Sequence, residues 1–135
     1  MSNEKNIITG IVVLAMFYMM SMSAHAVQAL YSIPANQVWT GGIPIARSGE
    51  VNYVTVSLAS VYPLKGIDTF KKVQARLVNY AGDLVSASES VVLEEGKGDK
   101  NIYLNSDYAY FTLVYLELRG NSNAAAEAVI NYNGN

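Results

Sequence analysis

Residues 72–80 read KVQARLVNY, and this stretch decides the fold class. Its apolar and polar residues alternate, so Val73, Ala75 and Leu77 point to one side of an extended chain while their neighbours point to the other. Such alternation is typical of a β-strand in a sheet with one buried and one wet face. The sequence therefore predicts a half-buried, antiparallel strand at this position.

A tight turn and a second strand are predicted directly after it. The turn is at 79–83, where Gly82 and Asp83 can adopt the positive φ that a short connection needs. Residues 84–93 then return as the second strand of a hairpin. Its expected outer face consists of Ser86, Ser88 and Ser90, and its expected inner face of Val85, Ala87, Val91 and Leu93.

Short runs rich in Val, Ile, Thr and Tyr recur along the rest of the chain, separated by Gly, Asn, Ser and Pro. They predict strands at 51–60, 102–105, 108–119 and 124–132, and one or two irregular edge strands within 27–46. Pro63 ends the first of these, since proline lacks the amide that a ladder needs. Residues 108–119 are apolar on both faces in the middle, which predicts either a central strand covered on both sides or a strand covered on one side by a partner. No stretch of about ten residues has a helical apolar period.

Seven or eight short strands predict an all-β fold, an antiparallel β-sandwich of immunoglobulin or fibronectin-like architecture. A jelly roll and a small closed barrel are the alternatives. The likeness is to the architecture alone, because the chain has no cysteine. The expected core consists of Val54, Val56, Leu58, Val73, Ala75, Leu77, Val91, Leu93, Val114, Leu116 and Ile130.

The first 26 residues are predicted to be a secretory signal peptide. A polar start that contains Lys5 precedes an apolar run at 7–20, and the A-x-A pattern of Ala24 and Ala26 suits signal peptidase. The alternative is a retained membrane anchor, which needs about 20 apolar residues. Residues 7–26 reach that length only by including polar side chains, so we expect cleavage. Residues 27–135 would then form a single domain without a stable membrane span, located in the periplasm, at the cell surface or in the medium.

Composition excludes most catalytic chemistry from residues 27–135. They contain no cysteine and no histidine, because His25 is the single histidine of the chain. Ser-His-Asp and Cys-His nucleophiles and the usual zinc or haem sites cannot be built without these residues. We therefore expect no enzyme and no cofactor. The alternative is a small carboxylate-dependent enzyme, since Glu89, Glu117 and Glu127 lie in predicted strands. The formal net charge is −2, and the lysines and arginines form no basic stripe along the sequence. We therefore do not expect nucleic acid as a partner.

The glycine-rich loop at 94–101 carries Glu94, Glu95, Asp99 and Asn101, whose oxygens could in principle bind calcium. Its spacing matches no ordered calcium motif, and Lys97 and Lys100 place positive charge beside it. We therefore expect a solvated loop that binds no metal.

Aromatic residues are the remaining functional signal. Tyrosine is abundant at 10 residues, and it combines a large apolar ring with a hydroxyl that can stay in water. The candidate binding aromatics are Trp39, Tyr103, Tyr108, Tyr110 and Tyr115. The expected function is that of a structural, adhesive or self-assembling exported domain, with a carbohydrate- or protein-binding module as the alternative. Residues 27–46 either pair with a neighbour's sheet edge or form an edge of their own sandwich.

Overall fold

A computed structural model describes residues 26–64 and 71–135, and we refer to these as the described residues. The predicted signal peptide lies outside them except for Ala26, where the first strand begins, so its cleavage stays a prediction. The elements are β1 (Ala26–Ile33), β2 (Ile43–Ala46), β3 (Tyr53–Pro63), β4 (Lys72–Val78), β5 (Val91–Glu94), β6 (Lys100–Tyr103), the 3-10 turn η2 (Ser106–Tyr108), β7 (Leu113–Gly120) and β8 (Ala126–Asn133).

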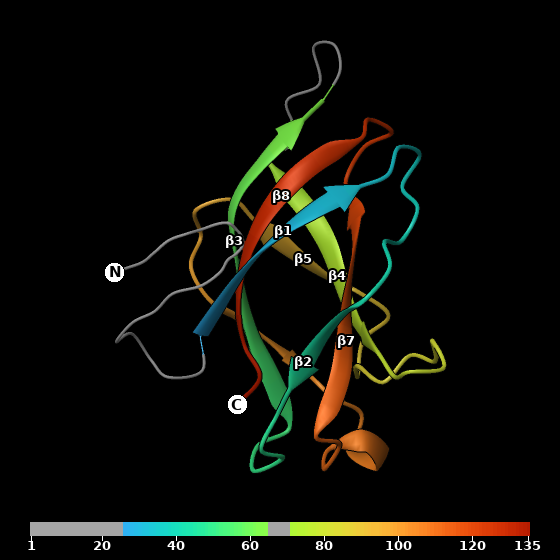
Figure 1. The fold of residues 1–135 in the computed structure, drawn as a ribbon, viewed down its shortest axis with the longest axis vertical. Coiled ribbons are helices and arrows are strands. Elements are labelled where there is room, and N and C mark those ends of the chain that lie inside the picture. The colour runs from blue at the N-terminus through green and yellow to red at the C-terminus, as the bar shows by residue number, and fades with distance from the viewer. Residues whose placement is uncertain (1–25, 65–70) are drawn as a thin grey trace, which may run out of the picture.

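The eight strands form two four-stranded antiparallel sheets, which confirms the predicted β-sandwich. One sheet has the order β1-β8-β3-β6 and the other the order β2-β7-β4-β5. Figure 1 shows β1, β8 and β3 side by side, with β5 of the second sheet behind them. Because each sheet has two free edges, the fold is not a closed barrel.

The strand order is that of a jelly roll, the first alternative from the sequence. The pairs β1/β8, β2/β7, β3/β6 and β4/β5 are nested, as if one long hairpin had been rolled into two sheets. In an immunoglobulin domain the first two strands are neighbours in one sheet. Here β1 and β2 lie in different sheets. Both are edge strands, so the segment 27–46 pairs within its own sandwich.

The core lies between the sheets and follows the alternation in the sequence. Ten of the eleven expected core residues are fully buried, and Val91 is half-buried against the others. Tyr31 adds a polar link across the core, because its hydroxyl donates to the backbone oxygen of Leu116 at 3.0 Å. Burial raises the pKa of Tyr31 well above its ordinary value, and burial also raises the pKa of Tyr132.

The hairpin prediction is right for its turn and partly right for its second strand, which pairs with β4 at Leu84 and again in β5 and is interrupted between them. The turn at 79–83 forms, with a hydrogen bond from the Asn79 amide to the Asp83 oxygen at 2.9 Å. The chain then leaves β4 and bridges Leu104 in the other sheet, and it returns to β4 only in β5. Ser86 is consequently buried rather than outward, with its hydroxyl accepting from the Leu77 amide at 3.2 Å. Ala87, expected inside, is exposed.

The predicted strand at 108–119 starts five residues too early. Residues Ser106–Tyr108 form η2, and β7 begins at Leu113. The cause is local, because the Asn105 side chain accepts a hydrogen bond from the Asp107 amide and so stabilises a turn. From Leu113 onward β7 is central in its sheet, as the first of the two predicted alternatives requires.

A buried arginine joins this turn to the loop after β2. The Arg47 guanidinium donates to the backbone oxygens of Ala109, Phe111 and Val51, and the Arg47 amide donates to the Thr112 oxygen at 2.9 Å. Burial lowers the pKa of Arg47, and its Nε has no hydrogen-bond partner in the described part of the chain. All its acceptors are backbone carbonyls.

Candidate functional site

The outward side of the sheet β1-β8-β3-β6 is a nearly uncharged surface that consists mostly of amides, hydroxyls and tyrosines, with Leu30 and Val129 as apolar members. Its strands alternate between buried residues and residues that point away from the core. Among the outward residues of these four described strands, Glu127 alone is charged. We call this surface the amide-tyrosine face and define it by Gln28, Tyr53, Thr55, Ser57, Asn101, Tyr103, Asn131, Asn133 and Asn135.

Two tyrosine rings stand together at one end of the amide-tyrosine face. Tyr53 of β3 and Tyr103 of β6 are directly opposite each other in the ladder. Their ring centroids are 5.4 Å apart with an interplanar angle of 64°, an edge-to-face contact. Tyr53 is half-buried and Tyr103 is 50% exposed. The pair therefore supplies a fixed aromatic surface open to solvent.

A row of hydrogen-bonded side chains crosses the strands beside the rings. Thr55 donates through Oγ1 to Asn101 Oδ1 at 2.8 Å, and Asn135 Nδ2 donates to Thr55 Oγ1 at 2.9 Å. The Asn135 backbone amide also donates to Asn133 Oδ1 at 2.9 Å. These bonds orient the amides and leave Asn101 Nδ2, which has no partner among the described residues, to donate to a ligand.

A second polar pair continues the surface toward β1. Gln28 Nε2 donates to Asn131 Oδ1 at 3.0 Å, and Ser57 lies opposite Asn131 on the other side of β8. The face is thus polar across all four strands, and its groups can both donate and accept.

Trp39, the only tryptophan, lies on the opposite side of the sandwich. The Arg76 and Arg119 guanidinium carbons are 4.2 Å and 4.6 Å from its ring centroid. Hydrogen bonds orient both arginines, because Arg76 Nε donates to Glu117 at 2.7 Å and Arg119 Nε donates to Gln74 at 2.8 Å. The indole is therefore partly buried and packs against two cations.

The other candidate aromatics are spread over the molecule. Tyr115 lies on the outer face of β7, with its ring 6.2 Å from that of Tyr80. Tyr108 packs edge-on against Phe111 at 5.1 Å, and Tyr110, at the turn between them, is 84% exposed. The structure thus places Tyr103 alone of the five candidates on the amide-tyrosine face.

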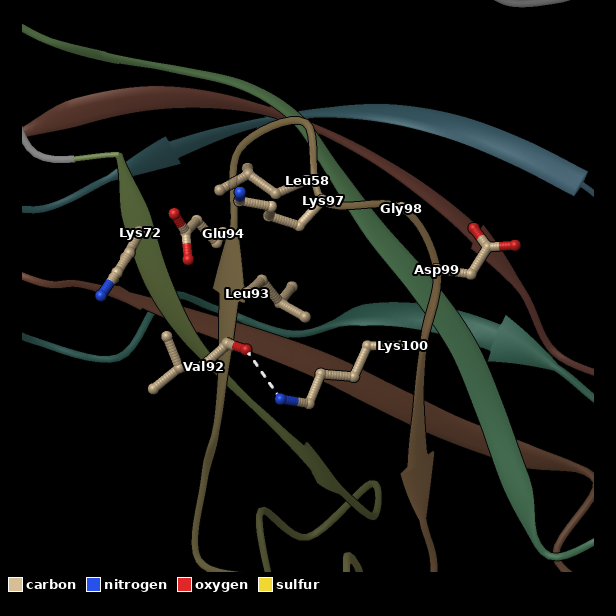
Figure 2. A pocket seen from close by; sticks show the side chains of 9 residues that line it. All are labelled: Leu58, Lys72, Val92, Leu93, Glu94, Lys97, Gly98, Asp99 and Lys100. Atoms are coloured by element: carbon tan, nitrogen blue, oxygen red, sulfur yellow. Dashed lines mark hydrogen bonds between the residues drawn. The ribbon is translucent and has the colours of Figure 1, made fainter.

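An open depression of about 440 Å³ lies where the chain crosses from β5 to β6 (Figure 2). Leu58 and Leu93 lie at this depression, and Lys100 reaches across it to donate to the Val92 backbone oxygen at 3.3 Å. Asp99 points away from that contact. The depression is the gap between two sheet edges, spanned by a lysine.

The acidic residues are dispersed. Within residues 26–64 and 71–135 no three acidic, histidine or cysteine side chains gather in a way that could hold a metal. Glu95 of the candidate calcium loop pairs with Lys71 at 3.2 Å. Glu117 and Glu127 point outward from different sheets, so they cannot act on one substrate as a carboxylate pair.

Sequence reasoning missed Tyr53, Thr55 and the C-terminal asparagines as parts of one surface. The available signal was the run of outward polar residues in β3, read together with N-Y-N at 131–133. This signal does not identify a common surface unless the pairing of β3 with β8 is known, because that pairing joins residues far apart in the sequence.

Comparison with protein-family models gives no match, and no curated protein matches the sequence. In the described parts of the chain there is no helix of the length and apolarity required to span a bilayer.

Proposed function

We propose that this chain is an exported, non-catalytic adhesive domain that binds neutral glycans through the amide-tyrosine face. The near absence of charge from that face carries the proposal. A binding surface for acidic polymers requires cations, which this face lacks. A neutral sugar instead presents hydroxyls and an apolar C–H side, and these fit oriented amides and an exposed ring.

The two tyrosines and the neighbouring amides supply both kinds of contact. The accessible ring of Tyr103 can pack against the C–H side of a sugar, while Asn101 donates to its hydroxyls. Tyrosine, serine and asparagine are also the residues that recognition surfaces use when they need rigid contact area and adaptable hydrogen bonds. Jelly rolls occur in lectin domains as well as in capsids, although fold alone does not decide function.

Retention on immobilised neutral polysaccharides tests the proposal, with an acidic polysaccharide as comparison. We expect at least one neutral polysaccharide to retain the protein. Retention should persist at about 0.5 M salt, where screening has shortened electrostatic interactions to about 4 Å. Failure on every neutral polysaccharide, or retention only on the acidic one at low salt, contradicts the proposal.

A matched pair of variants locates the site. Tyr103→Ala should weaken binding about tenfold, equivalent to about 1.4 kcal/mol of lost ring contact. Tyr110→Ala removes a ring that is 84% exposed but lies at the turn after η2, so it should leave binding unchanged. Equal losses in both variants would place the site elsewhere. Thermal unfolding of each variant separates lost binding from lost folding.

A further inference from the structure

The free edge of β1 is the unprotected edge of this sandwich. Strand β1 pairs with β8 on one side, and nothing among the described residues pairs with its other side. It is eight residues long with the sequence AVQALYSI, which contains no charge and no proline. In a strand, alternate residues direct their backbone N–H and C=O groups toward the open side. A long, uncharged edge of this kind is a template for pairing with another strand.

The other three edge strands are each protected, and each has four residues. Strand β2 contains Pro44, which cannot donate to a ladder. At the β5 edge, Lys100 donates to the Val92 oxygen. At β6, the Ala87 amide donates to the Tyr103 oxygen at 2.8 Å and so uses part of the ladder. Lysine, proline, short strands and a covering segment are the devices that prevent edge pairing, and β1 has none of them.

We infer that two copies of this chain pair through antiparallel β1 strands, with the two-fold axis beside Leu30. Leu30 points outward from the sheet and is 64% exposed. With the axis there, each Leu30 covers the other, and Gln28 of one copy stands opposite Ser32 of the second. An antiparallel pair of identical strands closes as a two-fold dimer, because the same surface is used on both sides.

Electrostatics permits this pairing. The nearest outward charge on the described strands of this sheet is Glu127, which lies opposite Ser32 on β8. Across the proposed axis the two Glu127 positions are three strand spacings apart and four residues apart along the strands. They are therefore separated by about 20 Å, beyond the screening length of about 8 Å at physiological salt. A second copy also offers a strand of the same length, whereas the β2, β5 and β6 edges are half as long.

Light scattering over a wide range of protein concentration tests the inference. The sample is the protein as it is purified from the cells that produce it. We expect a concentration-dependent monomer-dimer equilibrium. Leu30→Lys places two cations face to face at the axis and should leave a monomer. Val92→Lys is the matched control, because Val92 is 43% exposed on another edge strand and its variant should still dimerise. At concentrations so low that the parent is also monomeric, both variants should have the parent's melting temperature, which shows that each still folds.

A charge-reversal mixture tests the axis itself. Leu30→Glu alone should also be monomeric, and mixing it with Leu30→Lys should restore a dimer that contains one of each. A wild-type monomer at all concentrations, an undiminished Leu30→Lys dimer, or an assembly that grows beyond two copies would overturn the inference. Association does not depend on glycan binding, so either proposal can fail while the other stands.

Discussion

Replacing Arg47 by methionine measures what a buried guanidinium contributes to this fold. Methionine retains much of the apolar stem and removes the donors to the oxygens of Ala109, Phe111 and Val51. Each buried carbonyl left without a donor costs about 1–3 kcal/mol. Part of that loss is offset because a charge no longer has to be desolvated. We expect a net loss of about 3 kcal/mol in the free energy of unfolding, a large share of the roughly 5–15 kcal/mol typical of a domain.

Urea unfolding followed by Trp39 fluorescence gives the measurement, since this is the only tryptophan in the chain. Lys72→Met makes the same change of charge at an exposed residue and should alter stability by less than about 0.5 kcal/mol. A loss below about 1 kcal/mol for Arg47→Met would refute the reasoning. It would mean that water replaces the guanidinium at the three carbonyls or that the loop after β2 rearranges without cost.

Two further changes test the core. Leu77→Ala removes a side chain with 0% exposure and should cost about 2–5 kcal/mol in urea unfolding, while a loss below about 1 kcal/mol would contradict its burial. The raised pKa values of Tyr31 and Tyr132 should make stability constant below the ordinary tyrosine pKa of 10.0 and make it fall above that pH, because the unfolded chain ionises first. For the deeply buried Tyr31 the fall is about 1.4 kcal/mol per pH unit, so Tyr31→Phe should weaken the decrease of the melting temperature with pH above 10.0, and an unchanged decrease would contradict it.

The fold class was predictable because burial in a two-layer sandwich alternates along each strand. Val73, Ala75 and Leu77 could be placed in the core without knowing which strands pair. The same alternation does not indicate strand order, because a strand has the same apolar pattern in either sheet. The apolar pattern of residues 84–93 therefore predicts a single strand, although the chain crosses between sheets at Ser86. That crossing depends on a bridge to Leu104, which no local pattern encodes.

For the candidate site, the sequence predicts the type of residue involved but not which residues form it. An excess of tyrosine indicates a recognition surface, but the sequence cannot show which rings remain available. Trp39 is covered by arginines from β4 and β7, two strands distant from it in the chain. Arg47 was missed for a related reason, because arginine is ordinarily exposed and its burial depends on three carbonyls brought in by the fold.

The position of β1 links the proposed glycan binding to the proposed dimer. Pairing at its free edge would merge two four-stranded sheets into one of eight strands, with both amide-tyrosine faces on the same side. The two Tyr53 and Tyr103 pairs would then lie six strand spacings apart across the sheet and about twelve residues apart along the strands, a separation of about 50 Å. A polysaccharide long enough to span that distance could contact both, which multiplies retention without any new contact in either site.

Two measurements on Leu30→Lys should therefore give different results. Binding of a short soluble oligosaccharide should equal that of the parent protein, because Leu30 lies outside the ring and amide contacts. Retention on the immobilised polysaccharide should fall more than about tenfold, because the second site is lost with the dimer. Equal losses in both assays would place Leu30 within the glycan site. No loss in either would show that the two faces do not bind one polymer together, whatever the state of association.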